Sequence, residues 1–351
     1  MLIRKVFLAI FVTTSALEAQ APTAGLRVRV EGSPGVALPG ALVALLGASD
    51  NVVAEGVAGL DGRRTLAAPG GSYRVRVRRI GYRPFISGGV TLPHPDELVL
   101  QVETQRVVLS TMVVSASFRC GAIDPNAQTL SAVWDEIAKA LSASRLTTTD
   151  LAGIAFSRIY RMETDRFGKV TATDSSLQRV GANPPFGAVD AVVLAEKGYV
   201  IGDEASGWDH FGPDEVVLLS DQFAATHCFR LVRDAAHAGQ IGVAFEPVPR
   251  RTVSDIKGVL WVDEGSSELR QIDFHYVNAG IFDRFNGGGF THFRRMPSGA
   301  WIVDEWKLRM PRLQRFLGTG SLADTGPRIV VIGYIETGGG IIAPPERALR
   351  Q

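Results

Sequence analysis

Alternating apolar and polar positions run through most of the chain and predict β-strands rather than helices. In Tyr73–Val77 every second residue is apolar, so these side chains are expected to face a core while the interleaved arginines face water. Two further apolar runs, Leu98–Val102 and Val107–Val114, are short and bounded by polar residues. Short strands at this spacing are typical of a β-sandwich or a β-barrel.

Residues that favour turns separate these strands. Pro39-Gly40 supplies a corner, because proline presets φ and glycine tolerates positive φ. Asp61-Gly62 is a dipeptide favoured where both turn residues need positive φ, and Pro69-Gly70-Gly71 interrupts the chain before Tyr73. The early part of the chain is therefore expected to fold as an independent pair of sheets.

Apolar positions change to helical spacing from Thr129 onward. The apolar face of this expected helix consists of Leu130, Val133, Trp134, Ile137 and Leu141. A second helix is expected over about Pro213–Phe229, where a proline and two acidic residues suit a first helical turn. The second part of the chain therefore mixes helices with strands.

β-Structure resumes after the first helix. Ile154–Glu163 and Lys169–Val180 read as two strands about a turn at residues 165–168. The final third holds four alternating strands separated by turn residues, at Gly258–Asp263, Glu268–Tyr276, Gly289–Arg295 and Trp301–Pro311. This succession predicts an antiparallel meander.

Two resemblances follow from these motifs. The run from Gly25 to Val114, with Leu38–Leu45, Gly59–Arg63 and Pro69–Pro84 as its most distinctive pieces, resembles the carboxypeptidase regulatory-like domain, a transthyretin-type β-sandwich. The stretch Lys257–Pro311 looks like the curved half-barrel of periplasmic lipoprotein-carrier proteins. The resemblances imply a mainly β protein, with a transthyretin/immunoglobulin-like sandwich followed by an α+β domain that has a curved antiparallel sheet.

The expected domain organisation has five parts. They are a signal peptide at 1–19, the regulatory-like β-sandwich at 25–114, a linker at 115–128, a β-rich α+β domain at 129–335 and a flexible tail at 336–351. The glycines of the cluster Gly338–Gly340 read as turns or tail.

The first residues have the layout of a secretory signal peptide. Arg4 and Lys5 precede the apolar run Val6–Val12, and small residues up to Ala19 follow. This run is shorter than the roughly 20 residues that a membrane-spanning helix needs. The mature protein is therefore expected to be exported to the periplasm, secreted or associated with the outer membrane, with no integral membrane span after cleavage.

Composition and charge narrow the function classes. The chain has 351 residues and 46% hydrophobic content, enough for two domains with cores of their own. Its 37 basic and 36 acidic residues become 35 and 35 once Arg4, Lys5 and Glu18 leave with the signal peptide. A nucleic-acid binder normally has a basic excess, so nucleic acid is not expected as a partner.

The two cysteines, Cys120 and Cys228, are predicted to form a disulfide, since oxidising compartments preserve such bonds. Their separation is 228 − 120 = 108 residues. The alternative is a pair of buried free thiols.

No catalytic residues, metal ligands or cofactors are predicted. In the segment His94-Pro95-Asp96-Glu97, His94 and Glu97 match the His-x-x-Glu pair of zinc ligands in metallocarboxypeptidases. The pair is interpreted as part of a loop, because His94 lies between Pro93 and Pro95 and the catalytic domain that such a motif needs is missing. His227 and Cys228 are adjacent, which does not bring a base to a thiol. Asp209-His210 lacks a third ligand. The chain is therefore interpreted as a non-enzyme.

The leading hypothesis is an exported cell-envelope protein that binds or scaffolds, with envelope glycan, lipid or an outer-membrane protein as its partner. One alternative is a carbohydrate-binding module, because the sandwich resembles a carbohydrate-binding-like fold and sugars stack on aromatic rings. Tyr82, Phe85, Trp208 and Phe211 are the candidate ligand-binding residues. The other alternative is a periplasmic carrier of lipid or lipoprotein, which would use apolar residues on the concave face of the second domain. The candidates for this lining are Leu260, Val262, Ile272, Phe274, Phe290, Trp301, Val303 and Trp306.

Overall fold

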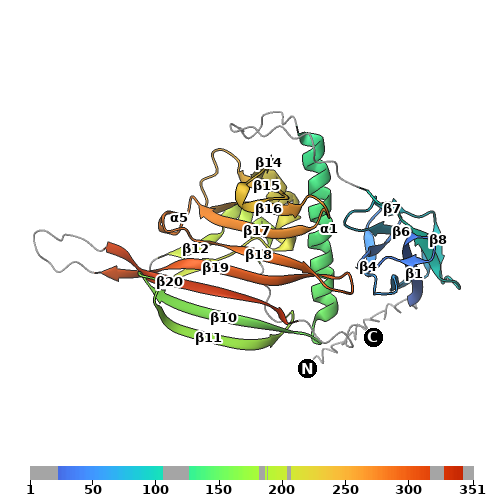
Figure 1. Cartoon of the computed structure of the whole chain (residues 1–351), viewed down its shortest axis with the longest axis horizontal. Helices are drawn as coiled ribbons and strands as arrows, with labels where there is room; N and C mark the ends of the chain where they lie inside the picture. Colours follow the sequence, from blue (N-terminus) through green and yellow to red (C-terminus); the bar gives the residue numbers. More distant parts are fainter. Residues whose placement is uncertain are drawn as a thin grey trace, which may run out of the picture.

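The computed structural model describes residues 23–105, 126–181, 186–187, 189–203, 207–316 and 328–342. Within them the protein is mainly β: a β-sandwich precedes a larger α+β domain built on a curved antiparallel sheet (Figure 1), which confirms the predicted fold class. The expected signal peptide and Val107–Val114 lie outside the described residues. Among the described helices, none combines the length and apolar character needed to cross a membrane.

The first domain is a sandwich of two sheets around one apolar core. One sheet has the order β2-β1-β5 with β9 parallel to β1, and the other has the order β4-β3-β6-β7 with β8 on β6. Its strands are β1 (Thr23–Ser33), β2 (Val36–Ala37), β3 (Leu42–Leu46), β4 (Val52–Val57), β5 (Arg63–Pro69), β6 (Gly71–Arg78), β7 (Phe85–Ile86), β8 (Val90–Leu92) and β9 (Leu98–Gln101).

The apolar residues of β6 face this core, as their alternation predicts. Val75 and Val77 are fully buried with Leu26, Val28 and Leu45 of the facing strands. The expectation that the arginines of β6 face water is met only in part, because Arg74, Arg76 and Arg78 are all half-buried. Burial lowers the pKa of the Arg78 guanidinium, and neighbouring Arg76 adds to this effect. A helix of the second domain covers this face of the sandwich, which no pattern within β6 reveals.

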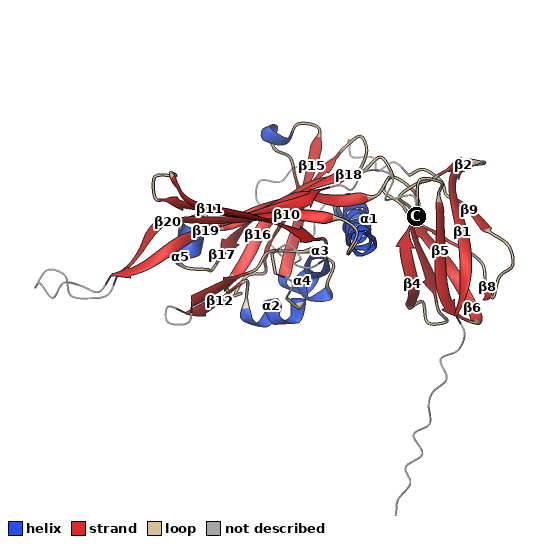
Figure 2. Ribbon diagram, turned by 90° about the horizontal axis from the view of Figure 1, so that it is seen from below, coloured by secondary structure: helices blue, strands red, loops and turns tan. Residues whose placement is uncertain are grey.

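That helix is α1 (Ala127–Leu151), and it begins where the helical spacing predicts. Val133, Ile137 and Leu141 of its expected apolar face are buried. Of the predicted linker 115–128, residues 115–125, including Cys120, lie outside the described part of the chain. Seen from below, α1 lies between the sandwich and the large sheet (Figure 2), and it contacts β3 and β4 on one side and β14–β17 and β19 on the other.

The second domain is organised around a nine-stranded antiparallel sheet with the order β11-β10-β20-β19-β18-β17-β16-β15-β14. The expected hairpin and the expected meander are both present. The strands are β10 (Phe156–Asp165), β11 (Val170–Arg179), β14 (His227–Val232), β15 (Gln240–Pro247), β16 (Asp255–Asp263), β17 (Leu269–Val277), β18 (Gly288–Arg295), β19 (Trp301–Phe316) and β20 (Arg328–Ile342).

The last strand differs from the expected flexible tail. β20 runs from Arg328 to Ile342 and lies between β10 and β19, so the glycines at 338–340 occupy the interior of the sheet. A Cβ at Gly338 would stand 2.5 Å from the Tyr160 hydroxyl and 2.7 Å from the Trp306 carbonyl oxygen. These glycines therefore allow close approach of neighbouring strands, which sequence alone does not distinguish from a turn.

The expected helix over Pro213–Phe229 is also different. It is divided into α3 (Glu215–Leu218) and α4 (Asp221–Thr226), and the chain then enters β14. Asp214 caps α3 by accepting a hydrogen bond from the Val217 amide at 2.8 Å, and Ser220 caps α4 in the same way with Phe223 at 3.1 Å. Because Ser220 offers a second helix start, the segment breaks there.

The remaining elements are short. They are α2 (Ala191–Lys197), β12 (Val200–Asp203), β13 (Gly207–His210), a 3₁₀ turn at Ala235–His237 and α5 (Ile281–Arg284). Among the described strands, β12 and β13 pair only with each other and form a hairpin outside the large sheet.

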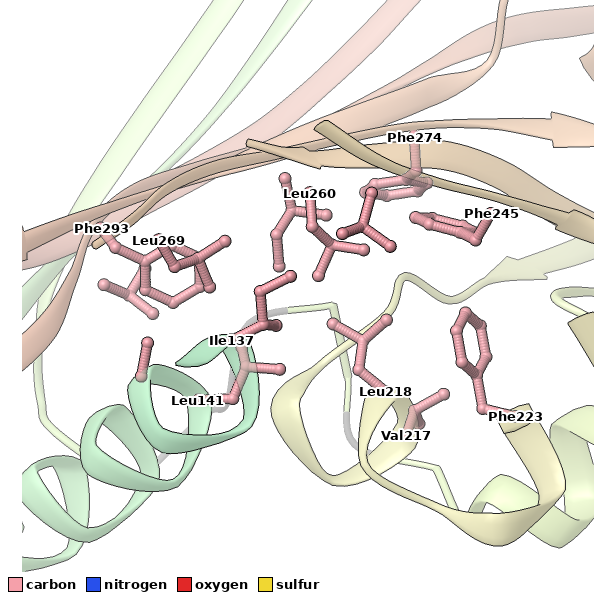
Figure 3. Packing of buried hydrophobic residues seen from close by; sticks show 14 of the residues in the cluster. Ile137, Leu141, Val217, Leu218, Phe223, Phe245, Leu260, Leu269, Phe274 and Phe293 are labelled. Carbon is pink, nitrogen blue, oxygen red and sulfur yellow. The ribbon is translucent and has the colours of Figure 1, made fainter. Parts of the chain in front are cut away.

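Helices fill the concave side of the sheet over β14–β18. Ile137 and Leu141 of α1, Val217 and Leu218 of α3 and Phe223 of α4 point toward the sheet (Figure 3). They pack against the buried sheet residues Phe245, Leu260, Leu269, Phe274 and Phe293. The expected concave lining of a carrier is thus an ordinary core at Leu260, Val262, Ile272, Phe274, Trp301 and Val303. Phe290 lies on the opposite face of the sheet, directly across from Asp273, while Trp306 has a different environment described below.

Candidate ligand pocket

A pocket of about 590 Å³ lies between the large sheet and the β12–β13 hairpin. Its sheet wall comes from β10, β19 and β20, whose residues are far apart in the sequence and adjacent in the sheet (Figure 1). Most of the lining is apolar, and it includes Ile159, Trp306, Leu308, Met310 and Ile335 from the strands. The polar residues of the lining are Arg161, Gln178, Asp209, His210 and Thr337.

Strand alternation explains the sheet wall. Trp306, Leu308 and Met310 of β19 line the pocket, while Lys307 and Arg309 between them pair with Glu336 on the other face. The sequence also predicts that this strand alternates. α1 and α5 contact β19, but among the described residues none of α1, α3 or α4 lines the pocket at residues 306–311. The alternation therefore supplies an apolar wall and the tertiary structure leaves it as a pocket.

A glycine shapes the floor of the pocket. A Cβ at Gly339 of β20 would stand 2.8 Å from Ile159 Cδ1 and 3.2 Å from Trp306 Nε1. Both of these side chains line the pocket. Glycine at this position therefore lets them lie close to the strand instead of being pushed into the cavity.

The opposite wall is the β12–β13 hairpin and the residue after it. Trp208, Asp209, His210 and Phe211 all line the pocket. Phe282 of α5 supports them, with its ring centroid 5.4 Å from that of Trp208 and 4.9 Å from that of His210. The Tyr276 hydroxyl donates to the Phe211 carbonyl at 2.7 Å. The hairpin is therefore fixed to β17 and α5 rather than standing alone.

Two of the four predicted ligand-binding residues, Trp208 and Phe211, thus lie in one pocket wall. Trp208 is 37% exposed, whereas Phe211 is partly buried against the core. Their position agrees with a ligand-binding role without testing it.

His210 is the titratable group most altered by the pocket. Burial lowers the pKa of its imidazole to about 4, and the neighbouring Asp209 carboxylate opposes this shift. Its Nε2 is buried and has no hydrogen-bond partner within the described part of the chain. The imidazole is therefore neutral at neutral pH. Within the described ranges, no three His, Cys, Asp or Glu side chains come together as a metal site.

Tyr82 and Phe85 lie elsewhere, in the sandwich. The Tyr82 carbonyl accepts a hydrogen bond from Lys139 Nζ of α1 at 3.0 Å, and the preceding Gly81 amide donates to Glu136 Oε2 at 2.8 Å. Lys139 is completely buried and pairs with Glu136 at 2.8 Å. Phe85 of β7 packs against the sandwich core.

The corner around Tyr82 is therefore a docking surface for α1. Burial raises the pKa of the Glu136 carboxyl, while hydrogen bonds from Lys139 and Gly81 act in the opposite direction. Two further ion pairs, Arg145–Glu55 at 2.5 Å and Arg64–Asp150 at 2.8 Å, extend the contact. Sequence reasoning missed this interface, although the acidic and basic residues of α1 were a signal that its second face meets a charged partner.

The other residues considered from the sequence have structural partners. Glu97 pairs with Arg63 at 2.7 Å, and His94 Nδ1 lies 2.9 Å from the Asp96 carbonyl oxygen. The fully buried Asp255 carboxylate lies 3.1 Å from His227 Nε2. Cys228 occupies β14 opposite Glu246, but Cys120 lies outside the described residues, so the Cys120–Cys228 disulfide stays a prediction.

Comparisons with known proteins give little further guidance. No protein-family model matches the chain, and no curated protein matches it. Among solved structures, it is similar to a DUF3823 family protein from Parabacteroides merdae ATCC 43184, with 15% sequence identity and a TM-score of 0.20. That match covers 74% of this chain and 98% of the other. At this TM-score the likeness carries no argument about fold or function, so the interpretation depends on the pocket itself.

Proposed function

We propose that this protein is a non-enzymatic, exported protein of the bacterial cell envelope that binds an apolar or amphiphilic ligand in the pocket of its second domain. In this proposal the sandwich is a carboxypeptidase regulatory-like domain that supports the second domain through α1. The single observation that carries the proposal is the apolar pocket between β10, β19 and β20 and the β12–β13 hairpin.

The size and lining of the pocket support binding. Small-molecule sites typically have volumes of roughly 300 to 1,000 Å³ and apolar or aromatic walls with a few polar groups. The pocket has a volume of about 590 Å³ and includes Trp208, Phe211 and Trp306 among its walls. Such walls favour a hydrocarbon chain over a fully hydroxylated sugar, because apolar surface gains most by leaving water.

The titratable groups of the pocket favour holding a ligand over converting it. An efficient acid or base has a pKa near the working pH, whereas the pKa of His210 is lowered to about 4. Asp209 precedes His210 on β13, and Arg161 lies across the pocket on β10. The glycan alternative is weaker at Tyr82 and Phe85, because both side chains pack against the sandwich core.

The proposed location depends on the leader at residues 1–19. A basic start, an apolar run and small residues ending at Ala19 support export. Expression with the native leader should yield periplasmic protein whose N-terminus follows residue 19, read by intact-mass spectrometry. Full-length protein retained in the cytosol would contradict export.

The ligand hypothesis is tested with two single-chain lipids, palmitate and monopalmitoylglycerol, at concentrations where both are monomeric. Native mass spectrometry of gently extracted protein should also show a bound acyl chain. Filling the pocket with Leu308→Trp should weaken binding of either lipid about tenfold or more, since it removes about 1.4 kcal/mol or more of binding free energy.

A matched control replaces a leucine outside the pocket. Leu177 of β11 is 62% exposed and lies opposite Arg158, away from the pocket. Leu177→Trp should leave both affinities unchanged. Failure of the wild-type protein to bind either lipid, or equal binding by Leu308→Trp, would overturn the proposed function.

A further inference from the structure

Two arginines share one carboxylate beside the pocket. Arg161, which lines the pocket, places Nη2 3.2 Å from Glu163 Oε1. Arg312 of β19 contacts the other oxygen, Glu163 Oε2, through Nη1. The two arginines, here called the arginine pair, thus share one carboxylate through these contacts.

The sheet brings Arg312 to Glu163, which lies 149 positions away in the sequence. Arg161 and Glu163 alternate on β10 and so project to the same side of the sheet. Arg312 reaches Glu163 across β20, where Gly333 is the neighbour of both Arg312 and Asp165. Because Gly333 has no side chain, nothing on β20 stands between the guanidinium and the carboxylate at this position.

The two guanidinium groups retain binding capacity. Their side chains are 53% and 30% exposed, so solvent reaches both. Each guanidinium has five N–H donors, and the contacts to Glu163 use one N–H of each. Arg312 Nε is buried without a hydrogen-bond partner in the described ranges. Arginine forks bind carboxylates and phosphates in a bidentate manner, which suits an acidic group arriving at this edge of the pocket.

The other charged groups of the pocket lie on the opposite wall. Asp209 belongs to β13, and His210 beside it is neutral at neutral pH. A ligand with one acidic end is therefore drawn toward the sheet wall and away from the hairpin. Its hydrocarbon part would then lie along Trp306, Leu308 and Met310.

Building on the proposed function, we propose that the ligand is a single-chain amphiphile with an acidic head group, and that the arginine pair binds this head group. A carboxylate and a phosphate share the required chemistry, since both offer oxygen pairs to a guanidinium fork. Glu163 competes with the head group for the same donors.

The test compares palmitate, 1-palmitoyl lysophosphatidate and neutral monopalmitoylglycerol on the mature wild-type protein. Both acids should bind about tenfold or more tightly than the neutral lipid, because charged hydrogen bonds add to equal burial of the chain. The preference should shrink as salt rises, since the arginines are partly exposed. The tighter of the two acids identifies the head-group chemistry.

Variants assign the preference to the arginine pair. Arg161→Gln and Arg312→Gln should each reduce the affinity for the acids toward that for the neutral lipid. Glu163→Gln should strengthen binding of the acids, because it removes the carboxylate that competes for the arginines. A variant that failed to fold could not show this gain. Arg158→Gln is the matched control, because Arg158 is an exposed arginine of the same strand on the other face of the sheet.

The outcomes distinguish failure of the head-group assignment from failure of the proposed function. Equal affinity for acidic and neutral lipids, unchanged by these variants, would overturn the head-group assignment while the pocket function stands. A preference for acids that Arg158→Gln abolishes and Arg161→Gln does not would also overturn it. Binding of none of the three lipids would overturn the proposed function itself.

Discussion

Both halves of the nine-stranded sheet have strands that alternate apolar and polar residues, but the apolar face forms a core in one half and lines a pocket in the other. Over β14–β18 the apolar face is covered by α1, α3 and α4, and Leu260 and Ile272 are buried in a continuous core. Over β10, β19 and β20 the apolar face carries Leu308 and Ile335, which line the pocket. We call these the filled half and the pocket half. Alternation thus indicates which face of a strand is apolar, and the covering element decides whether that face becomes core or binding site.

The first test of this comparison removes the predicted Cys120–Cys228 disulfide and measures the loss of stability. Cys228 lies on β14, the outermost strand of the filled half. Closing a loop of 108 residues is expected to stabilise the protein by about 4 to 5 kcal/mol through the entropy of the unfolded chain. Urea denaturation of the wild type and of Cys228→Ser should differ by this amount. Two free thiols in unreduced wild-type protein would contradict the pairing.

The second test removes one leucine from each half. Leu260 is fully buried, so Leu260→Ala should lower the free energy of unfolding by about 2 to 5 kcal/mol. Leu308→Ala should cost less than about 1.5 kcal/mol, because this side chain is partly exposed in the pocket and leaves a smaller cavity. Denaturant titration of both variants measures the difference. Equal costs would show that the pocket half is packed as tightly as the filled half.

The third test uses the pH dependence of the pocket half. The pKa of His210 is lowered by burial from 6.5 to about 4, so the unfolded chain binds this proton more tightly than the folded chain. Stability from neutral His210 is therefore present above pH 6.5 and is lost as the pH falls toward 4. Its size is up to about 3 kcal/mol, less any screening by solvent at this partly exposed side chain.

His210→Asn provides the comparison for this pH effect. The difference in unfolding free energy between pH 7 and pH 4.5 should be smaller in the variant than in the wild type. Denaturation curves at the two pH values measure it. An identical pH dependence in both proteins would mean that His210 is not desolvated as the pocket geometry requires.

The fourth test strains the contact between the sandwich and the turn before β19 without changing a residue that lines the pocket. Gly40 and Gly35 both have positive φ, at +73° and +77°, so alanine carries a similar backbone cost of about 1 to 2 kcal/mol at each. A Cβ at Gly40 would also collide with the Gly299 carbonyl of the turn before β19, whereas at Gly35 it meets nothing within 4 Å in the described part of the chain. Gly40→Ala should therefore cost roughly 1 to 3 kcal/mol more than Gly35→Ala.

The same pair of variants separates stability from binding. Because β10, β19 and β20 are not altered, lipid affinity should be equal in Gly40→Ala and Gly35→Ala at temperatures where both are folded. Thermal unfolding and lipid titration measure the two quantities. Reduced affinity in Gly40→Ala alone would show that the sandwich shapes the pocket directly.

Parts of the candidate site were predictable. Trp208 and Phe211 were predicted as ligand-binding residues because sugars stack on aromatic rings, and both line the pocket. The alternation of Trp301–Pro311 correctly predicted the strand that provides Trp306 and Leu308. Arg161 and Arg312 gave no such signal, because arginines on alternating strands are ordinary and their shared partner depends on which strands are neighbours.

Errors arose where one local pattern fits two structures. Glycines at 338–340 suit a flexible tail as well as a strand that passes close to Tyr160 and Trp306. Pro213–Phe229 suits one helix as well as two capped ones, and Ser220 decides between them by accepting from Phe223. Tyr82 suits a sugar platform as well as a helix-docking corner. In each case the choice between the two structures depends on a residue elsewhere in the chain or on one specific hydrogen bond.

The sequence by itself determined strands β6, β9, β10, β11 and β16–β19 and helix α1, because these follow from the periodicity of side chains along a short stretch. Only the tertiary structure decided that β20 enters the sheet between β10 and β19, that Lys139 is buried against the sandwich, and that Arg161 and Arg312 meet at Glu163. The physical reason is that strand order and helix placement depend on how distant apolar surfaces are buried together, and local periodicity does not encode that pairing.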